Sequence, residues 1–160
     1  MRVQRVLMTV NESVSWTVLD DDGDIVAPVE RYLGYLTVLE RSPNTVRAYA
    51  TSIKMWFEFL AVTSTEWDGV GVEDVARFVS WLRAPAANVA VLATGTGVRE
   101  PSTINRHLAA VFGLYDHHAR AGVGVASQLI VWRRVCVGAP LMVSAEFTRA
   151  VITPIGADDG

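Results

Sequence analysis

The sequence predicts a mainly α-helical domain of four helices, preceded by a short β-rich segment. Apolar residues recur at helical spacing in four stretches, residues 28–41, 42–60, 72–82 and 102–121. Residues 1–26 instead alternate apolar and polar side chains, which is typical of strands. The chain has 160 residues, of which 51% are hydrophobic and 19% charged, so it is long and apolar enough for one globular core.

The N-terminal segment, residues 1–26, is expected to form a small β-hairpin or meander. Residues 2–9 and 13–19 have the pattern of two strands, and residues 25–26 could form a short returning strand. The turn DDDGD at residues 20–24 begins like a calcium loop, but the later ligands of such a loop are missing. We therefore expect a solvated turn here and no metal site.

The second helical stretch, residues 42–60, has the clearest signals. Ser42 is suited to the N-cap and Pro43 to the first helical position. One side presents a stripe of apolar residues, while the other presents polar and basic ones, and no acidic residue lies between Arg41 and Phe57. In a chain of net charge −3 this local absence of acidic groups is a departure from the average composition.

The fourth stretch has a suitable N-cap in Ser102 and a C-terminal stop in Gly122. Its apolar stripe ends at His118, which we expect at the edge of the core. The other side carries polar residues with small ones, Ala110 and Gly113, in its middle. These small residues would let another surface approach closely, either DNA or a neighbouring helix.

Two segments resemble a known family. SPNTVRAYATSIKMWFEFL (residues 42–60) is similar to the first long helix of the core-binding domain of tyrosine recombinases, the phage-integrase family, and STINRHLAAVFGLYDHHARAGV (residues 102–123) is similar to its last helix. The resemblance implies a SAM-like core-binding domain at residues 27–123, with a β extension at 1–26 and a linker remnant and aberrant tail at 124–160. It also implies double-stranded DNA of a recombination site as the partner, further recombinase protomers as candidate partners, and no cofactor.

The same resemblance implies which residues contact DNA, because the corresponding two helices supply many of the family's major-groove contacts. Arginine and lysine neutralise phosphates, and small polar residues near helix N-termini help to bind them. The candidates are Asn44, Thr45, Arg47, Thr51 and Lys54 on one helix, with Thr103, Asn105, Arg106 and His107 on the other. The competing interpretation is an ordinary solvated helix face.

Catalysis is not expected. The family's nucleophilic tyrosine and its arginine, lysine and histidine partners lie in a second domain, and no tyrosine, lysine or histidine follows Val123 here. We therefore expect a truncated recombinase that binds DNA without cleaving it and is not itself an enzyme. The rival hypothesis is a helical protein-interaction module that has lost its DNA function.

Other chemistry finds little support. The single cysteine, Cys136, excludes an internal disulfide and a cysteine-based zinc site, and the adjacent His117 and His118 point too far apart to share a compact metal site. No stretch has the ~18 apolar residues of a transmembrane helix, so we expect a cytoplasmic protein without a membrane partner.

Overall fold

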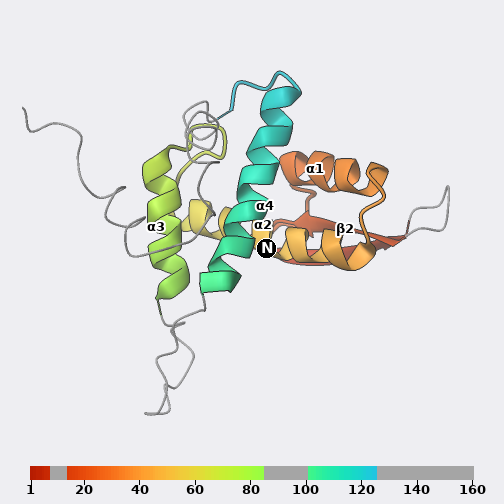
Figure 1. Ribbon diagram of the computed structural model, residues 1–160, viewed down its shortest axis with the longest axis horizontal. Coiled ribbons are helices and arrows are strands. Elements are labelled where there is room, and N and C mark those ends of the chain that lie inside the picture. Colours follow the sequence, from red (N-terminus) through yellow and green to blue (C-terminus); the bar gives the residue numbers. More distant parts are fainter. Residues whose placement is uncertain (8–13, 85–100, 126–160) are drawn as a thin grey trace, which may run out of the picture.

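The computed structural model describes residues 1–7, 14–84 and 101–125, and confirms the mainly α prediction (Figure 1). The elements are β1 (Arg2–Leu7), β2 (Val14–Leu19), α1 (Ala27–Val38), α2 (Pro43–Thr63), α3 (Val72–Arg83) and α4 (Pro101–Arg120). None of these four helices combines the length and apolarity needed to cross a membrane. The linker remnant and tail predicted at residues 124–160 lie outside the described residues from 126 onward.

The N-terminal segment is a two-stranded antiparallel hairpin, in which Arg2 pairs with Leu19 and Leu7 with Val14. The returning strand considered at residues 25–26 is reduced to one isolated bridge between Leu19 and Ile25. The Asp20 carboxylate accepts hydrogen bonds from the backbone N–H groups of Asp22 and Asp24, which stabilise the acidic turn. The chain then enters α1 at Ala27, which leaves no length for a third strand.

Helix α2 is the longest element and lies against both the hairpin and α4. The Ser42 side chain caps it by accepting from the backbone N–H of Thr45 at 3.2 Å, as the sequence predicts. Its buried arc is wider than the single predicted stripe, because Ser52, Trp56 and Phe59 are buried as well. Of these additional buried residues, Ser52 and Trp56 contact α4, and a single periodic stripe does not reveal this second neighbour of α2.

The contact between α2 and α4 holds the centre of the molecule, where α4 crosses α2 (Figure 1). Trp56 Nε1 donates to the Tyr115 hydroxyl at 3.0 Å, and that hydroxyl donates to the Trp67 carbonyl at 2.7 Å. Burial raises the pKa of Tyr115 well above its usual range, so the hydroxyl stays protonated and remains a donor. This chain of bonds ties α2, the α2–α3 connection and α4 together.

Helix α4 is buried on two sides, and this changes two sequence expectations. His118 lies in the core at 1% exposure rather than at its edge, and its Nε2 shares a 2.8 Å hydrogen bond with the Pro28 carbonyl at the start of α1. The small residues serve helix packing. Ala110 is buried, and a Cβ added at Gly113 would lie 2.2 Å from the Tyr32 hydroxyl of α1.

We expect Gly113→Ala to lower the free energy of unfolding by up to about 2 kcal/mol. Alanine favours a helix by about 1 kcal/mol over glycine, but overpacking against the buried Tyr32 ring typically costs about 1–3 kcal/mol. Urea denaturation of Gly113→Ala alone and combined with Tyr32→Phe measures the coupling. Since Tyr32→Phe removes the closest atom, the cost should shrink in the double variant, and an equal cost in both backgrounds would contradict this contact.

Candidate nucleic-acid interface

The outward arc of α2 carries most of the predicted contact residues. Asn44, Arg47 and Thr51 are exposed, and they lie on one side of the helix, away from its buried arc. The Arg47 guanidinium lies over the Trp16 ring of the hairpin, 5.0 Å from the ring centroid. A cation over an aromatic face at this distance is attracted by the ring quadrupole, so Arg47 is held at the surface instead of moving freely.

Two other predicted residues of α2 already have partners. The Lys54 ammonium pairs with the Glu58 carboxylate one turn later at 3.0 Å, and both side chains are about one-third exposed. The Thr45 hydroxyl shares a 2.8 Å hydrogen bond with Ser42 in the helix cap. An anion would therefore compete with Glu58 for Lys54, whereas it would meet Arg47 directly.

On α4 the predicted residues differ in accessibility. Arg106 is exposed, and Thr103 and Asn105 are half-buried. The Asn105 Oδ1 atom is enclosed and accepts no hydrogen bond from the described part of the chain. Arg106 is therefore the member of this group best placed to meet a large external partner.

The outward placement predicted for His107 is wrong, because its side chain is only 5% exposed. Its Nδ1 shares a 2.9 Å hydrogen bond with Ser52 Oγ on α2. Ser52 Oγ donates its single proton to the Ala48 carbonyl, so His107 must donate from Nδ1. The polar character of His107 predicts an outward position. In the structure its hydrogen bond is made instead with a buried partner 55 positions away.

This buried bond joins the two outward faces. Ser52 is next to Thr51 and His107 is next to Arg106, so the bond brings an exposed residue of each helix to the same junction. Within the described residues neither Arg47 nor Arg106 has an acidic side chain at ion-pair distance. Each of the two crossing helices therefore presents one exposed arginine without an acidic partner among the described residues.

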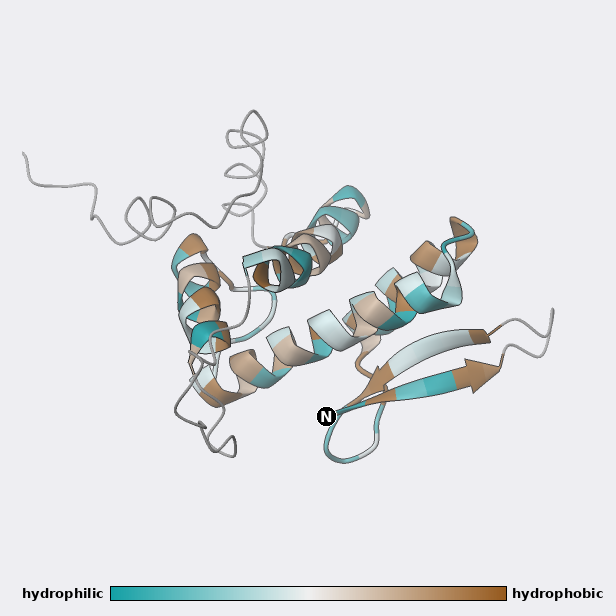
Figure 2. Cartoon of the chain, turned by 60° about the horizontal axis from the view of Figure 1, so that its bottom comes forward, coloured by the Kyte–Doolittle hydropathy of each residue, from teal (hydrophilic) through white to brown (hydrophobic). Residues whose placement is uncertain are grey.

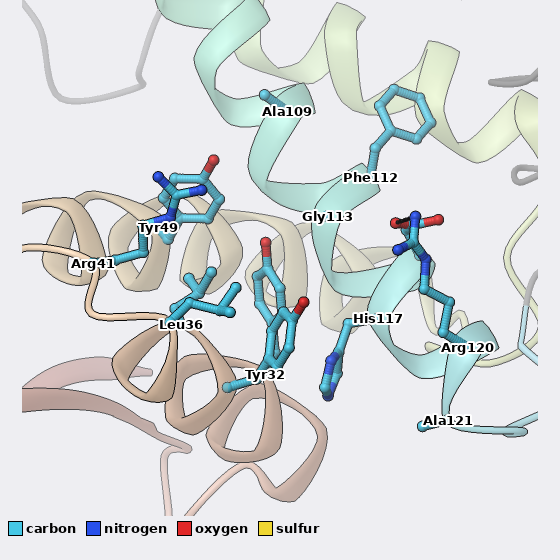
Figure 3. Close-up of a pocket in the computed structure, with 13 residues that line it drawn as sticks. Tyr32, Leu36, Arg41, Tyr49, Ala109, Phe112, Gly113, His117, Arg120 and Ala121 are labelled. Atoms are coloured by element: carbon cyan, nitrogen blue, oxygen red, sulfur yellow. Dashed lines mark ion pairs between the residues drawn. The ribbon is translucent and has the colours of Figure 1, made fainter.

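A separate groove of about 620 Å³ lies between α1, the start of α2 and the second half of α4 (Figure 3). Its walls are rich in aromatic rings, with Tyr32, Tyr35 and Tyr49 on one side and His117 opposite; the His117 ring centroid is 4.6 Å from that of Tyr35. None of the nine predicted contact residues lines it.

The charges around this groove are largely compensated. Arg120 pairs with Asp116 on the same helix at 2.9 Å. Partial burial lowers the pKa of His117, the neighbouring His118 lowers it further, and Asp116 opposes both effects, so the imidazole is neutral at pH 7. Only Arg41, at one end of the lining, is a basic side chain for which the structure shows no ion pair among the described residues. The described residues also contain no group of three or more potential metal ligands.

Residues 29–122 match the family model of the phage integrase N-terminal SAM-like domain, the N-terminal domain of tyrosine recombinases. The chain belongs to this family. Membership associates it with DNA recombination, and the four-helix fold agrees with the SAM-like architecture that the resemblance implies.

Three sequences of transposase A from transposon Tn554 of Staphylococcus aureus are similar to the chain, two of them from strains Mu50 and N315. Each is 32% identical to the chain over 123 residues, which cover 76% of the chain and 34% of the relative. The chain thus spans about a third of the length of these relatives. No solved structure matches it significantly.

Sequence reasoning missed the aromatic support of Arg47. Trp16 lies 31 positions before Arg47 on strand β2, and the pattern of that strand carries no signal for a contact with α2. No periodic pattern in the sequence indicates that the hairpin packs against α2.

We expect His107→Ala to lower the free energy of unfolding by about 1–3 kcal/mol, because it removes a buried hydrogen bond and leaves Ser52 with an unsatisfied lone pair. Arg106→Ala, at the adjacent exposed position, should change it by no more than about 0.5 kcal/mol. Urea denaturation of both variants, together with Ser52→Ala and the Ser52–His107 double variant, measures the coupling. Strict additivity of Ser52→Ala and His107→Ala would contradict the bond.

Proposed function

We propose that the helical domain, residues 27–123, binds double-stranded DNA of a recombination site through the outward faces of α2 and α4. The observation that supports it best is the pair Arg47 and Arg106, two exposed cations without acidic partners among the described residues, on helices joined by the Ser52–His107 bond. Family membership adds to this, because tyrosine recombinases act on DNA.

Each residue of the interface has its own role in this proposal. Arg47 and Arg106 bind phosphates or the acceptor edge of guanine, for which the planar guanidinium is suited. Asn44 and Thr45 lie in the first turn of α2, where backbone N–H groups and the helix dipole favour a phosphate. Lys54 contributes after giving up Glu58. Thr103 and Asn105 supply hydrogen bonds beside Arg106, and Thr51, whose hydroxyl donates to the Arg47 carbonyl, offers an acceptor beside Arg47. His107 positions the adjacent Arg106 through its buried hydrogen bond to Ser52.

We further propose that this domain does not cleave DNA. Tyr32 and Tyr115 are buried, and Tyr115 is committed to Trp56 and Trp67. Tyr35 is 41% exposed, but it lies by the aromatic groove, where Arg120 is neutralised by Asp116 and His117 is uncharged. A transferring phosphate needs several convergent cations, and the groove does not offer them.

A protein-interaction module is the second candidate, and one observation favours it. Tyr35, Val38 and Leu39 leave an apolar end on α1, with 41%, 80% and 46% of their surfaces exposed. Such a patch beside an aromatic groove is typical of a protein contact, and another recombinase protomer would be a fitting partner. This function and DNA binding use different surfaces, so they can be separated by mutation.

We expect Arg47→Ala, Lys54→Ala and Arg106→Ala each to weaken DNA binding at low salt. Each phosphate contact that is lost should reduce the slope of log K against log salt by about 0.9. Lys54→Ala should have the smallest effect because its ammonium is already paired with Glu58. Fluorescence anisotropy with an attachment-site duplex over a salt series measures both quantities, with thermal unfolding to verify the fold.

The matched control is Arg77→Ala on α3, an exposed arginine paired with Asp74 at 3.5 Å and distant from the proposed interface in sequence and on another helix. It should leave affinity and salt slope unchanged. If Arg47→Ala and Arg106→Ala behave like this control, the DNA-binding proposal is wrong and the protein-interaction candidate is favoured.

Covalent trapping on a suicide DNA substrate tests the absence of cleavage. We expect no protein–DNA adduct above background, because no tyrosine in the described domain faces a cluster of uncompensated cations. Tyr35→Phe is the control, since it removes the most exposed tyrosine hydroxyl among those placed by the structure. An adduct that the wild type forms and Tyr35→Phe loses would overturn this part of the proposal.

A further inference from the structure

We propose that the N-terminal hairpin is a third DNA-contacting element, and that Arg5 binds the phosphate backbone beside Arg47. The proposal rests on the DNA-binding function inferred for α2 and α4 and extends it to a segment outside the matched residues 29–122. Its ligand is the phosphodiester backbone of duplex DNA, because the residues involved offer positive charge and N–H donors that match the anionic phosphate oxygens.

The register of the hairpin places Arg5 next to Trp16. The two residues are direct partners across the antiparallel strands, so their side chains project from the same face of the sheet, with Cβ atoms about 5 Å apart. Arg47 lies over that same Trp16 ring. One tryptophan is therefore flanked by an arginine from the neighbouring strand and an arginine from α2.

The docking of the hairpin fixes this arrangement. Strand β2 contacts both α1 and α2, and the hairpin lies along the long helix α2 (Figure 2). Val18 is fully buried on the face that carries Trp16, whereas Arg5 and Arg47 are exposed. This face of the hairpin is therefore buried near the N-terminal end of β1, where Val18 lies. It is accessible to solvent where the two arginines lie.

The contact with Trp16 prepares Arg47 for this role. The attraction of the guanidinium to the ring is electrostatic and uses none of its N–H donors, so these remain available. Phosphate is bound by these donors. The tryptophan therefore orders the cation without consuming the donors that an anion would need.

The acidic residues that follow β2 lie near the N-terminus of the chain. Asp20, Asp21 and Asp22 line a shallow pocket with Arg2 and the N-terminus, and the Met1 ammonium pairs with Asp21. Arg2 projects from the opposite face of β1, because side chains alternate along a strand. Arg5 is three residues away, roughly 10 Å along the strand, which is about one Debye length at 0.1 M salt. Within the described residues it has no ion pair.

These positions provide a matched pair of variants on one strand, Arg5→Ala and Arg2→Ala, with Arg5→Lys to restore charge. Binding of the full chain to an attachment-site duplex is measured by anisotropy across a salt series. We expect Arg5→Ala to weaken binding by up to about tenfold at 50 mM salt and to reduce the salt slope by about 0.9. Arg2→Ala should leave both unchanged, and Arg5→Lys should keep most of the slope.

The outcomes separate this proposal from the one it rests on. If Arg47→Ala and Arg106→Ala weaken binding while Arg5→Ala matches Arg2→Ala, the hairpin proposal is wrong and the α2–α4 interface stands. If the wild type binds no duplex, both are wrong. Unchanged thermal unfolding of Arg5→Ala excludes loss of the hairpin as the cause, and an equal loss in Arg2→Ala would show a nonspecific charge effect and overturn the proposal.

Discussion

The buried junction of α2 and α4 is the constraint on which the rest of the structure depends. Trp56, fully buried on α2, donates to Tyr115 of α4, and Tyr115 donates in turn to the Trp67 carbonyl. Each bond lies in a low-dielectric interior, where an unmade partner costs about 1–3 kcal/mol. Because both donors must be satisfied at once, the two helices have little freedom to rotate or slide, and their crossing is fixed.

The fixed crossing determines which residues remain for binding. Buried residues such as His107, Ala110 and Leu114 flank the apolar stripe of α4, so the buried arc of this helix is wider than the stripe alone. What remains outward is a narrow row that includes Arg106, and on α2 a similar row that includes Arg47. Packing therefore leaves one exposed arginine in each of these two rows.

The local part of this arrangement could be predicted from the sequence, and the relations between distant segments could not. Periodicity and the Ser42 cap located α2 closely, since these signals act within one or two turns. His107 was misplaced because its partner, Ser52, is on another helix, and a polar side chain without a visible partner is expected outside. The Arg47–Trp16 contact depends on how the hairpin docks, which no single-segment pattern encodes.

The same placement explains how an acidic chain can present a basic surface. Many of its carboxylates have structural tasks on other faces: Asp20 winds the hairpin turn, Glu30 accepts from Thr17, and Asp74 accepts from the backbone N–H of Gly71 at 2.9 Å to begin α3. Charges separated by more than a Debye length, about 8 Å at physiological salt, are largely screened from one another. A phosphate near Arg47 would therefore respond to the cations beside it far more than to the net charge of −3. The net charge of the chain affects how an anionic partner approaches from a distance. The packing of α2, α4 and the hairpin determines which charges that partner meets on contact.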